Sequence, residues 1–117
     1  MNYVDGFVIA VPAANKQKYI EHAKEAAALF KDLGAIRMVE CWGDDVPKGK
    51  VTDFRSAVKA QDDEVVLFSW IEWPDKATRD TAMEKIMEDP RFDAMAKEMP
   101  FDGKRLIYGG FQPILDV

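Results

Sequence analysis

Cysteine, histidine and long hydrophobic runs are all scarce in this sequence of 117 residues. Cys41 is the only cysteine, so no internal disulfide can form, and the disulfide-rich class of small secreted domains is excluded. His22 is the only histidine, and neither an HExxH motif nor a paired-cysteine motif occurs, so we expect no metal site and no cofactor. No apolar run approaches the roughly 20 residues that are needed to cross a bilayer.

The N-terminal stretch MNYVDGFVIAVPAANK lacks the basic start that is typical of a signal peptide. Its apolar run carries Asp5 and ends at Pro12, a pattern that indicates a strand. Together with the single cysteine, this pattern predicts a location in the cytoplasm.

Basic side chains are outnumbered, since 16 Lys and Arg face 21 Asp and Glu, for a formal net charge of −5. Nucleic acids and anionic membranes are bound through clustered basic side chains. The short basic groups at 48–50 and 103–105 both have acidic neighbours, which indicates solvated loops. We therefore expect neither nucleic acid nor a membrane as a partner.

The sequence does contain enough apolar material for one core, with 48% hydrophobic residues and ordinary contents of aromatic and charged ones. A chain of this length buries about two thirds of the surface that it exposes when unfolded. We predict a single domain over residues 1–117.

Alternating and helical apolar patterns predict four strands, over residues 3–11, 35–43, 65–73 and 104–112. Helices are predicted over 15–33, 75–88 and 89–100, with Asn15, Asp75 and Asp89 as N-caps and Gly34 as a C-terminal stop. Gly109 and Gly110 indicate a bulge or a close backbone approach in the last strand.

The connector over residues 44–63 is unusually long for a compact domain. Phe54, Ala57 and Val58 fit a short helical turn, but the same residues also fit a strand paired with the next one, and the sequence does not decide between them.

The element order is strand, helix, strand, strand, helical region, strand, which predicts an α+β ferredoxin-like βαββαβ sandwich with its helices on one face of an antiparallel sheet. The strand VVLFSWIEW at 65–73 is apolar on both faces, so the second face also needs a cover. A second copy of the chain, packed sheet to sheet, is the simplest one. We expect a homodimer that forms a dimeric α/β barrel, although an apolar partner protein also fits. Which face meets the helices is left open.

Five segments carry a resemblance over nearly the whole chain: YVDGFVIAVP at 3–12, VECWGDDVPKGKVTDF at 39–54, AVKA at 57–60, VVLFSWIEWP at 65–74 and MPFDGKRLIYGGF at 99–111. In these segments the sequence resembles the YbaA-like proteins, a bacterial family of unknown function. The resemblance implies a fold of the dimeric α/β-barrel superfamily, whose other families include cofactor-free oxygenases, haem-degrading enzymes and small-molecule isomerases. It implies no particular reaction and no catalytic residues.

The first predicted helix carries an apolar stripe at helical spacing, formed by Tyr19, Ala23, Ala26, Ala27, Phe30 and Leu33. His22 lies at the edge of this stripe, beside Ala26 and Leu29. There it can face a cleft between helix and sheet and act as a general base or a ligand-binding group. The alternative is a rim histidine that is satisfied by water or by a neighbouring carboxylate.

Asp5 and Glu40 lie inside apolar strands, where an unpaired charge is costly, and Arg79 points partly inward on the second predicted helix. Ion pairing within the fold or across a dimer is the favoured interpretation. The alternative is a polar pocket for an anionic or carbonyl-bearing ligand.

Trp42 and Trp70 are candidates for lining such a pocket, although aromatic side chains in strands more often lie in a core or an interface. Cys41 is expected to be a small buried hydrophobic residue. The segment GDDVPKGKVT departs from a phosphate-binding loop, because five residues separate its glycines and Val51 replaces the hydroxyl residue. Nucleotide binding is rejected there.

The preferred hypothesis is a cytoplasmic homodimer that binds or transforms a small, partly apolar molecule in a cleft between helices and sheet, without a metal. His22 is its expected acid–base group, and Glu40 or Arg79 is expected to orient the ligand. The alternative is a non-catalytic dimer that acts through protein contacts, with an interior that leaves no cavity above roughly 300 Å³. RNA binding ranks third, because the chain is acidic.

Overall fold

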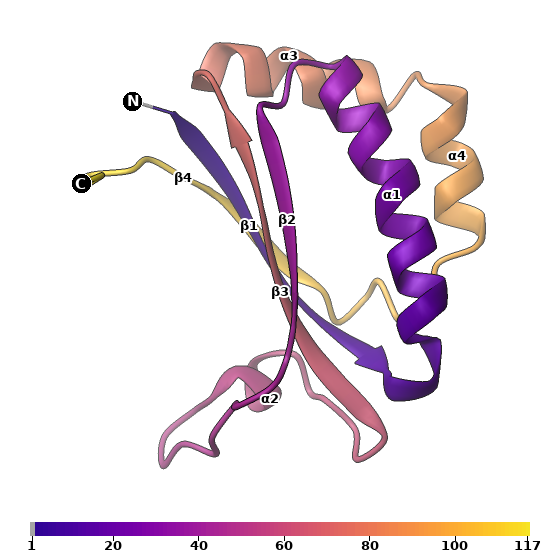
Figure 1. Ribbon diagram of the computed structural model, residues 1–117, viewed down its shortest axis with the longest axis vertical. Coiled ribbons are helices and arrows are strands. Elements are labelled where there is room, and N and C mark those ends of the chain that lie inside the picture. The colour runs from indigo at the N-terminus through magenta and orange to yellow at the C-terminus, as the bar shows by residue number, and fades with distance from the viewer. Residues whose placement is uncertain (1) are drawn as a thin grey trace.

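The computed structural model describes residues 2–117 and pairs four strands in one antiparallel sheet (Figure 1). The strands are β1 (Tyr3–Pro12), β2 (Arg37–Trp42), β3 (Glu64–Trp73) and β4 (Ile107–Phe111), and their order in the sheet is β2-β3-β1-β4. Strands β1 and β2 both run antiparallel to β3, which lies between them, and β1 likewise separates β3 from β4. The α+β class and the four-stranded antiparallel sheet are thus confirmed.

Three helices lie on one side of the sheet: α1 (Lys16–Asp32), α3 (Lys76–Ile86) and α4 (Pro90–Lys97) (Figure 1). The connector contains a short helix, α2 (Phe54–Ala57), so the helical interpretation of this segment is confirmed and the paired strand is wrong. None of the helices in residues 2–117 is long and apolar enough to cross a membrane.

Two of the three predicted N-caps form as expected. Asp75 accepts a hydrogen bond from the backbone N–H of Thr78 at 2.7 Å, and Asp89 accepts one from Arg91 at 2.9 Å. Asn15 makes no cap bond, because a 3-10 turn, η1 (Ala13–Asn15), precedes α1 and takes Asn15 out of the extended conformation of a capping residue. Its side chain instead donates to the carbonyl of Pro100 at 3.0 Å.

The face of β1 and β3 that meets the helices is now identified by burial. Its interior side chains pack beneath α1 and α3, and they are Asp5, Ile9, Val11, Leu67, Ser69, Ile71 and Trp73. Tyr3 belongs to the same face and lies directly over Gly110, where any Cβ would collide with its ring. The register of β1 with β4 continues through Gly109 and Gly110, so these glycines provide a close approach rather than a bulge.

Helix α1 is buried on two sides. Tyr19 packs against Ile9 and Leu67 of the sheet, as the apolar stripe predicts. Leu29, which the stripe does not include, is fully buried against Ile86 and Met95. Helices α3 and α4 therefore bury a side of α1 that packing against the sheet alone would leave exposed.

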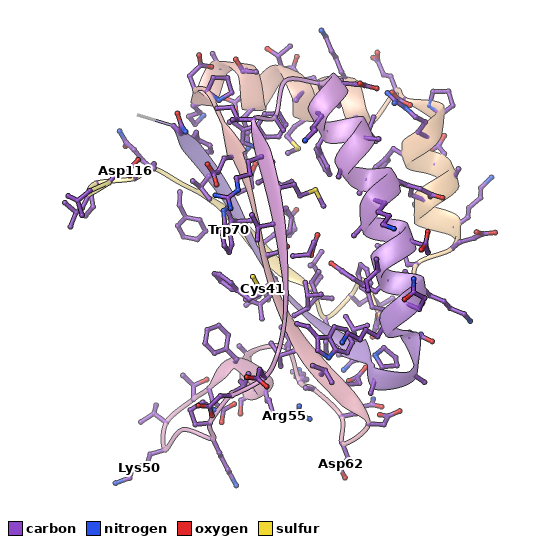
Figure 2. The ribbon with its side chains drawn as sticks, viewed as in Figure 1. Cys41, Lys50, Arg55, Asp62, Trp70 and Asp116 are labelled. Atoms are coloured by element: carbon purple, nitrogen blue, oxygen red, sulfur yellow. The ribbon has the colours of Figure 1, made fainter. Side chains whose placement is uncertain are left out.

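The opposite face of the sheet is covered only at one end, where Val58 of the connector packs on Ala10 and Val66. Beyond this end Phe68 is 44% exposed and Phe111 is 61% exposed. We call this surface the open face; its exposed members are Phe54, Phe68, Ile107 and Phe111. Figure 2 shows Trp70 and Cys41 on the side of the sheet away from α1. Cys41 is only half-buried there, so the expectation of a buried thiol is wrong.

Candidate functional site

The helix-covered side of the sheet is hollowed at two places that share Tyr19 as a wall. A small apolar cavity of about 180 Å³ lies between α1, α4 and the centre of the sheet. A groove of about 390 Å³ lies between α1 and the edge strand β2. The groove is lined by Lys16, Tyr19, Ile20, Ala23, Lys24, Ala27, Met38, Glu40, Trp42 and Leu67. Of these two spaces, the groove has the volume of typical ligand sites, which begins near about 300 Å³, and the cavity does not.

Tyr19 and Glu40 form the polar centre of the groove. The phenol oxygen of Tyr19 donates a hydrogen bond to Oε2 of Glu40 at 2.8 Å, across the gap between α1 and β2. Ser69, which is opposite Glu40 in the β2–β3 ladder and is itself buried, also hydrogen-bonds this carboxylate. Two hydroxyl groups therefore hold the Glu40 side chain in place.

Burial sets the proton affinity of both groups. It raises the pKa of Glu40 above its ordinary value, although the hydrogen bonds from Tyr19 and Ser69 oppose this effect by favouring the carboxylate. The pKa of Tyr19 is raised far above its usual range, chiefly by burial and then by the negative charge of Glu40. Tyr19 therefore keeps its proton and acts as a donor to Glu40.

The mouth of the groove carries an aromatic and basic pair. The ammonium group of Lys16 lies 5.4 Å from the centroid of the Trp42 ring, within the range of a cation–π contact. Lys24, two helical turns along α1, lines the same groove. A ligand in the groove would therefore meet an apolar floor, one carboxylate and a basic rim.

His22 lies on the other hollow, not in the groove. Its Nε2 is 3.2 Å from the carbonyl oxygen of Met95, and its ring packs edge-on against Phe101 at a centroid distance of 6.1 Å. Because a carbonyl only accepts hydrogen bonds, Nε2 must carry the hydrogen. His22 thus connects α1 to α4. It borders this cavity, which is smaller than typical ligand sites, and also an outer hollow of about 530 Å³ between α1 and α4.

Asp5 and Arg79 form an ion pair at the far end of the sheet. Asp5 is 2% exposed and accepts hydrogen bonds from Nε and Nη2 of Arg79, at 3.1 and 2.8 Å, and from the indole of Trp73 at 2.9 Å. The guanidinium also lies 5.3 Å from the ring of Tyr3. The hydrogen-bond donors to Asp5 are the side chains of Arg79 and Trp73, both of which belong to the folded protein itself. This is the arrangement of an ion pair that stabilises the fold.

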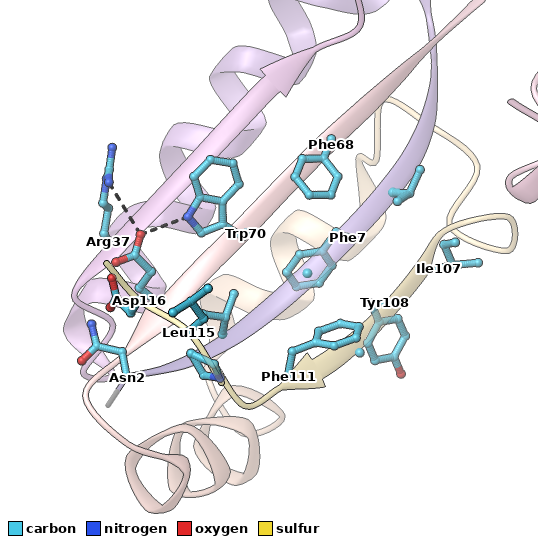
Figure 3. A pocket seen from close by; sticks show the side chains of 16 residues that line it. Asn2, Phe7, Arg37, Phe68, Trp70, Ile107, Tyr108, Phe111, Leu115 and Asp116 are labelled. Carbon is cyan, nitrogen blue, oxygen red and sulfur yellow. Dashed lines mark hydrogen bonds and ion pairs between the residues drawn. The ribbon is translucent and has the colours of Figure 1, made fainter. Parts of the chain in front are cut away.

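Trp70 lies on the open face, where Figure 3 shows it beside a broad hollow of about 790 Å³. Its indole donates to Oε2 of Glu72 at 3.0 Å, and Glu72 lies 3.7 Å from Arg37. Phe111 and Leu115 lie across this hollow in the same view.

The six candidate residues thus occupy four places in the fold. Only Glu40 and Trp42 share a hollow, while His22, the pair of Asp5 and Arg79, and Trp70 lie elsewhere. Tyr19 and Ser69 were not predicted as site residues from the sequence. Tyr19 was visible as the one hydroxyl-bearing member of the apolar stripe, whereas Ser69 required the register of β2 with β3.

Within residues 2–117, no group of three or more His, Cys, Asp and Glu side chains is arranged to hold a metal ion. The polar groups of the groove are one carboxylate, one phenol hydroxyl and two ammonium groups. This set is suited to hydrogen bonding and proton transfer.

Comparison with known proteins places the chain in a family. Residues 2–103 match the family described as "Protein of unknown function (DUF1428)". The chain belongs to this family. It is 62% identical over 116 residues to the uncharacterized protein YbaA of Escherichia coli K12, with 99% of both chains covered, and equally similar to YbaA of Shigella flexneri. The resemblance to YbaA-like proteins is thereby confirmed.

A solved structure shares the fold. It is a mutant of SnoaB, described as a cofactor-independent oxygenase from Streptomyces nogalater, and it superposes with a TM-score of 0.56 over 99% of this chain and 96% of its own. The two sequences are 15% identical, so the likeness concerns the fold alone.

Proposed function

We propose that this protein binds a small, partly apolar molecule in the groove between α1 and β2, and that it does so as a homodimer. The observation that carries the proposal is the Tyr19–Glu40 hydrogen bond on the floor of an apolar groove of about 390 Å³. Apolar walls with a few convergent polar groups are the usual composition of a small-molecule site. The name of the SnoaB neighbour agrees with a fold that accommodates small molecules.

The exposed apolar side chains of the open face are the basis for proposing a dimer. Exposed aromatic and aliphatic side chains gather there from β3, β4 and the connector, and the apolar C-terminal tail, with Ile114 94% exposed, follows directly. Soluble monomers rarely leave such a contiguous apolar surface in water. Two copies packed sheet to sheet, as ferredoxin-like units of a dimeric α/β barrel, would bury it on both. A cytoplasmic location completes the proposal, since the single Cys41 suits a reducing compartment.

The competing hypothesis of a non-catalytic interaction dimer predicts an interior without a ligand-sized space. The cavity of about 180 Å³ beside His22 is compatible with it, but the groove exceeds the limit of roughly 300 Å³. We therefore favour ligand binding, and we assign it to the groove rather than to the cavity.

Native mass spectrometry of freshly purified protein tests both parts of the proposal. We expect the mass of a dimer, with an additional small molecule that is released on denaturation. The Ala27→Phe variant fills the groove and should lose the additional mass, while Ala28→Phe, at the next and exposed position of α1, should retain it. A monomer at micromolar concentration would contradict the dimer, and a retained mass that is unaffected by Ala27→Phe would contradict the groove.

A further inference from the structure

We propose that Glu40 is the acid–base residue of the groove and takes a proton from the bound molecule, which belongs to the class of weakly acidic hydroxyl compounds such as phenols and enols. This inference rests on the proposed function, because it names the chemistry of the same groove. It replaces the expectation that His22 supplies the proton-accepting group.

In its hydrogen bonds with Tyr19 and Ser69, the Glu40 carboxylate is the acceptor. Tyr19 keeps its proton because its phenol is buried beside a negative charge, so it donates to the carboxylate. Ser69 supplies a second hydroxyl from β3. A carboxylate has two oxygens and about four lone-pair directions, so these two partners leave accepting capacity for a ligand.

The surroundings of Glu40 increase its affinity for a proton. The walls of the groove beside it are Met38, Leu67 and the aliphatic side of α1. Burial in this apolar lining disfavours the charged carboxylate, and protonation by a ligand relieves that cost.

Two basic side chains of α1 border the groove and suit the second product of the transfer, which is an anion. Lys16 is held against Trp42, and Lys24, which also lies 3.8 Å from Glu21, lines the same groove. In the transfer the O–H bond of the ligand breaks, its electron pair stays on the ligand oxygen, and the proton joins the Glu40 carboxylate. The step needs no oxidant, and the basic rim of the groove attracts the resulting anion.

His22 is poorly placed for the same task. It borders the small cavity beyond Tyr19, and its Nε2 is engaged with the Met95 carbonyl. A ligand in the groove would contact Tyr19, Glu40 and Trp42 before it reached the imidazole.

The test uses two probes of nearly equal shape, 4-nitrophenol and its methyl ether 4-nitroanisole, which lacks the acidic hydrogen. We expect the wild-type protein to bind 4-nitrophenol at least about tenfold more tightly, since only the phenol makes a charge-assisted hydrogen bond. We also expect the bound phenol to show the nitrophenolate absorption band at a pH at which the free compound is mostly protonated. Glu40→Gln should abolish both the preference and the band.

Three variants control for folding and for other groups. Glu40→Asp keeps a shorter carboxylate and should retain part of the preference, whereas His22→Gln and the exposed Glu84→Gln should leave it unchanged. Equal binding of both probes by the wild type, or a preference that survives Glu40→Gln, would overturn the inference. If purified protein retains a small molecule but binds neither probe, the proposed function stands and this inference fails. If it retains nothing and binds neither, both fail.

Discussion

Asp5 and Arg79 are joined by two hydrogen bonds between the first strand and the helix α3, at 2.8 and 3.1 Å. The carboxylate has almost no contact with solvent, so the guanidinium is its principal charge partner. The hydrogen bonds that Arg79 donates to Asp5 also raise the pKa of Arg79 above its ordinary value. Strand and helix are therefore connected by a charged contact inside the fold.

Breaking this pair should destabilise the protein. Asp5→Asn keeps an acceptor for Trp73 but leaves Arg79 without its buried counter-charge, so we expect a loss of about 2–3 kcal/mol in the free energy of unfolding. Urea denaturation measures the change. Asp80→Asn is a matched control, because Asp80 contacts the same arginine from a solvated position and its loss should change stability far less. Equal effects of the two variants would contradict a buried ion pair.

Glu40 is expected to cost stability at neutral pH. Its folded-state pKa is raised above the ordinary value of 4.5, so the native state binds protons more tightly than the unfolded state. The contribution of Glu40 to stability is therefore fully present below about pH 4.5 and is lost as pH rises through the folded pKa. Glu40→Gln should raise the Tm at pH 8, and the gain should vanish in acid.

Thermal unfolding of both proteins between pH 4 and pH 8 measures this difference. Glu84→Gln, which removes an exposed carboxylate on α3, is the control for the loss of one negative charge. A Glu40→Gln protein that is less stable than wild type at pH 8 would show that the carboxylate, rather than its burial, dominates.

Glu64 should have the opposite pH dependence. Arg105 donates to both of its oxygens, at 2.6 and 2.7 Å, and these hydrogen bonds lower the pKa of Glu64. Because this pKa is lower in the folded state than in the unfolded state, Glu64 stabilises the fold at pH values above its unfolded-state pKa, near 4.5. This stabilisation is lost as pH falls through the folded-state pKa. The Glu64→Gln protein should lose less stability than wild type between pH 5 and pH 3, as measured by circular dichroism during acid titration. The same loss in both proteins would contradict this contribution.

The open face predicts how the dimer can be dissociated. Phe68 is half-exposed and contacts the rings of Phe54 and Trp70, so a lysine there can reach water in a monomer but not between two packed sheets. Phe68→Lys should weaken dimerisation at least about 100-fold, because the symmetric interface receives two charges. Sedimentation velocity over a concentration series measures the change.

Met87→Lys is the matched control, since Met87 is 69% exposed at the end of α3, away from the sheet. It should leave the dimer intact. A Phe68→Lys protein with unchanged dimer affinity would show that the open face is covered by something other than a second copy.

The strands and long helices were predictable from the sequence because their signals are local. Asp75 and Asp89 each cap a helix through backbone groups two or three residues away, and Gly34 has the positive φ of 111° that the stop predicted. Such contacts join residues that are neighbours in the sequence, so they do not depend on the tertiary packing of the chain. The predicted cap at Asn15 was wrong, because its side chain donates a hydrogen bond to the carbonyl of Pro100, 85 residues away.

The site was predictable only in part, because its contacts are not local. The Tyr19–Glu40 bond joins two elements 21 residues apart and depends on the register of the edge strand β2. The burial of Leu29 and Val58 was likewise not predictable. Both residues are apolar in the sequence, but Leu29 is buried by α4 and Val58 by the open face, and these contacts depend on the packing of the whole chain.

Tyr19 is also a partition. Together with Met38, it lines both the cavity beside His22 and the groove beside Glu40, so these two side chains separate the two spaces. If both were shortened, the spaces would join into one channel beneath α1, and His22 and Glu40 would open onto the same interior. The length of molecule that this fold accepts therefore depends on the side chains at these two positions.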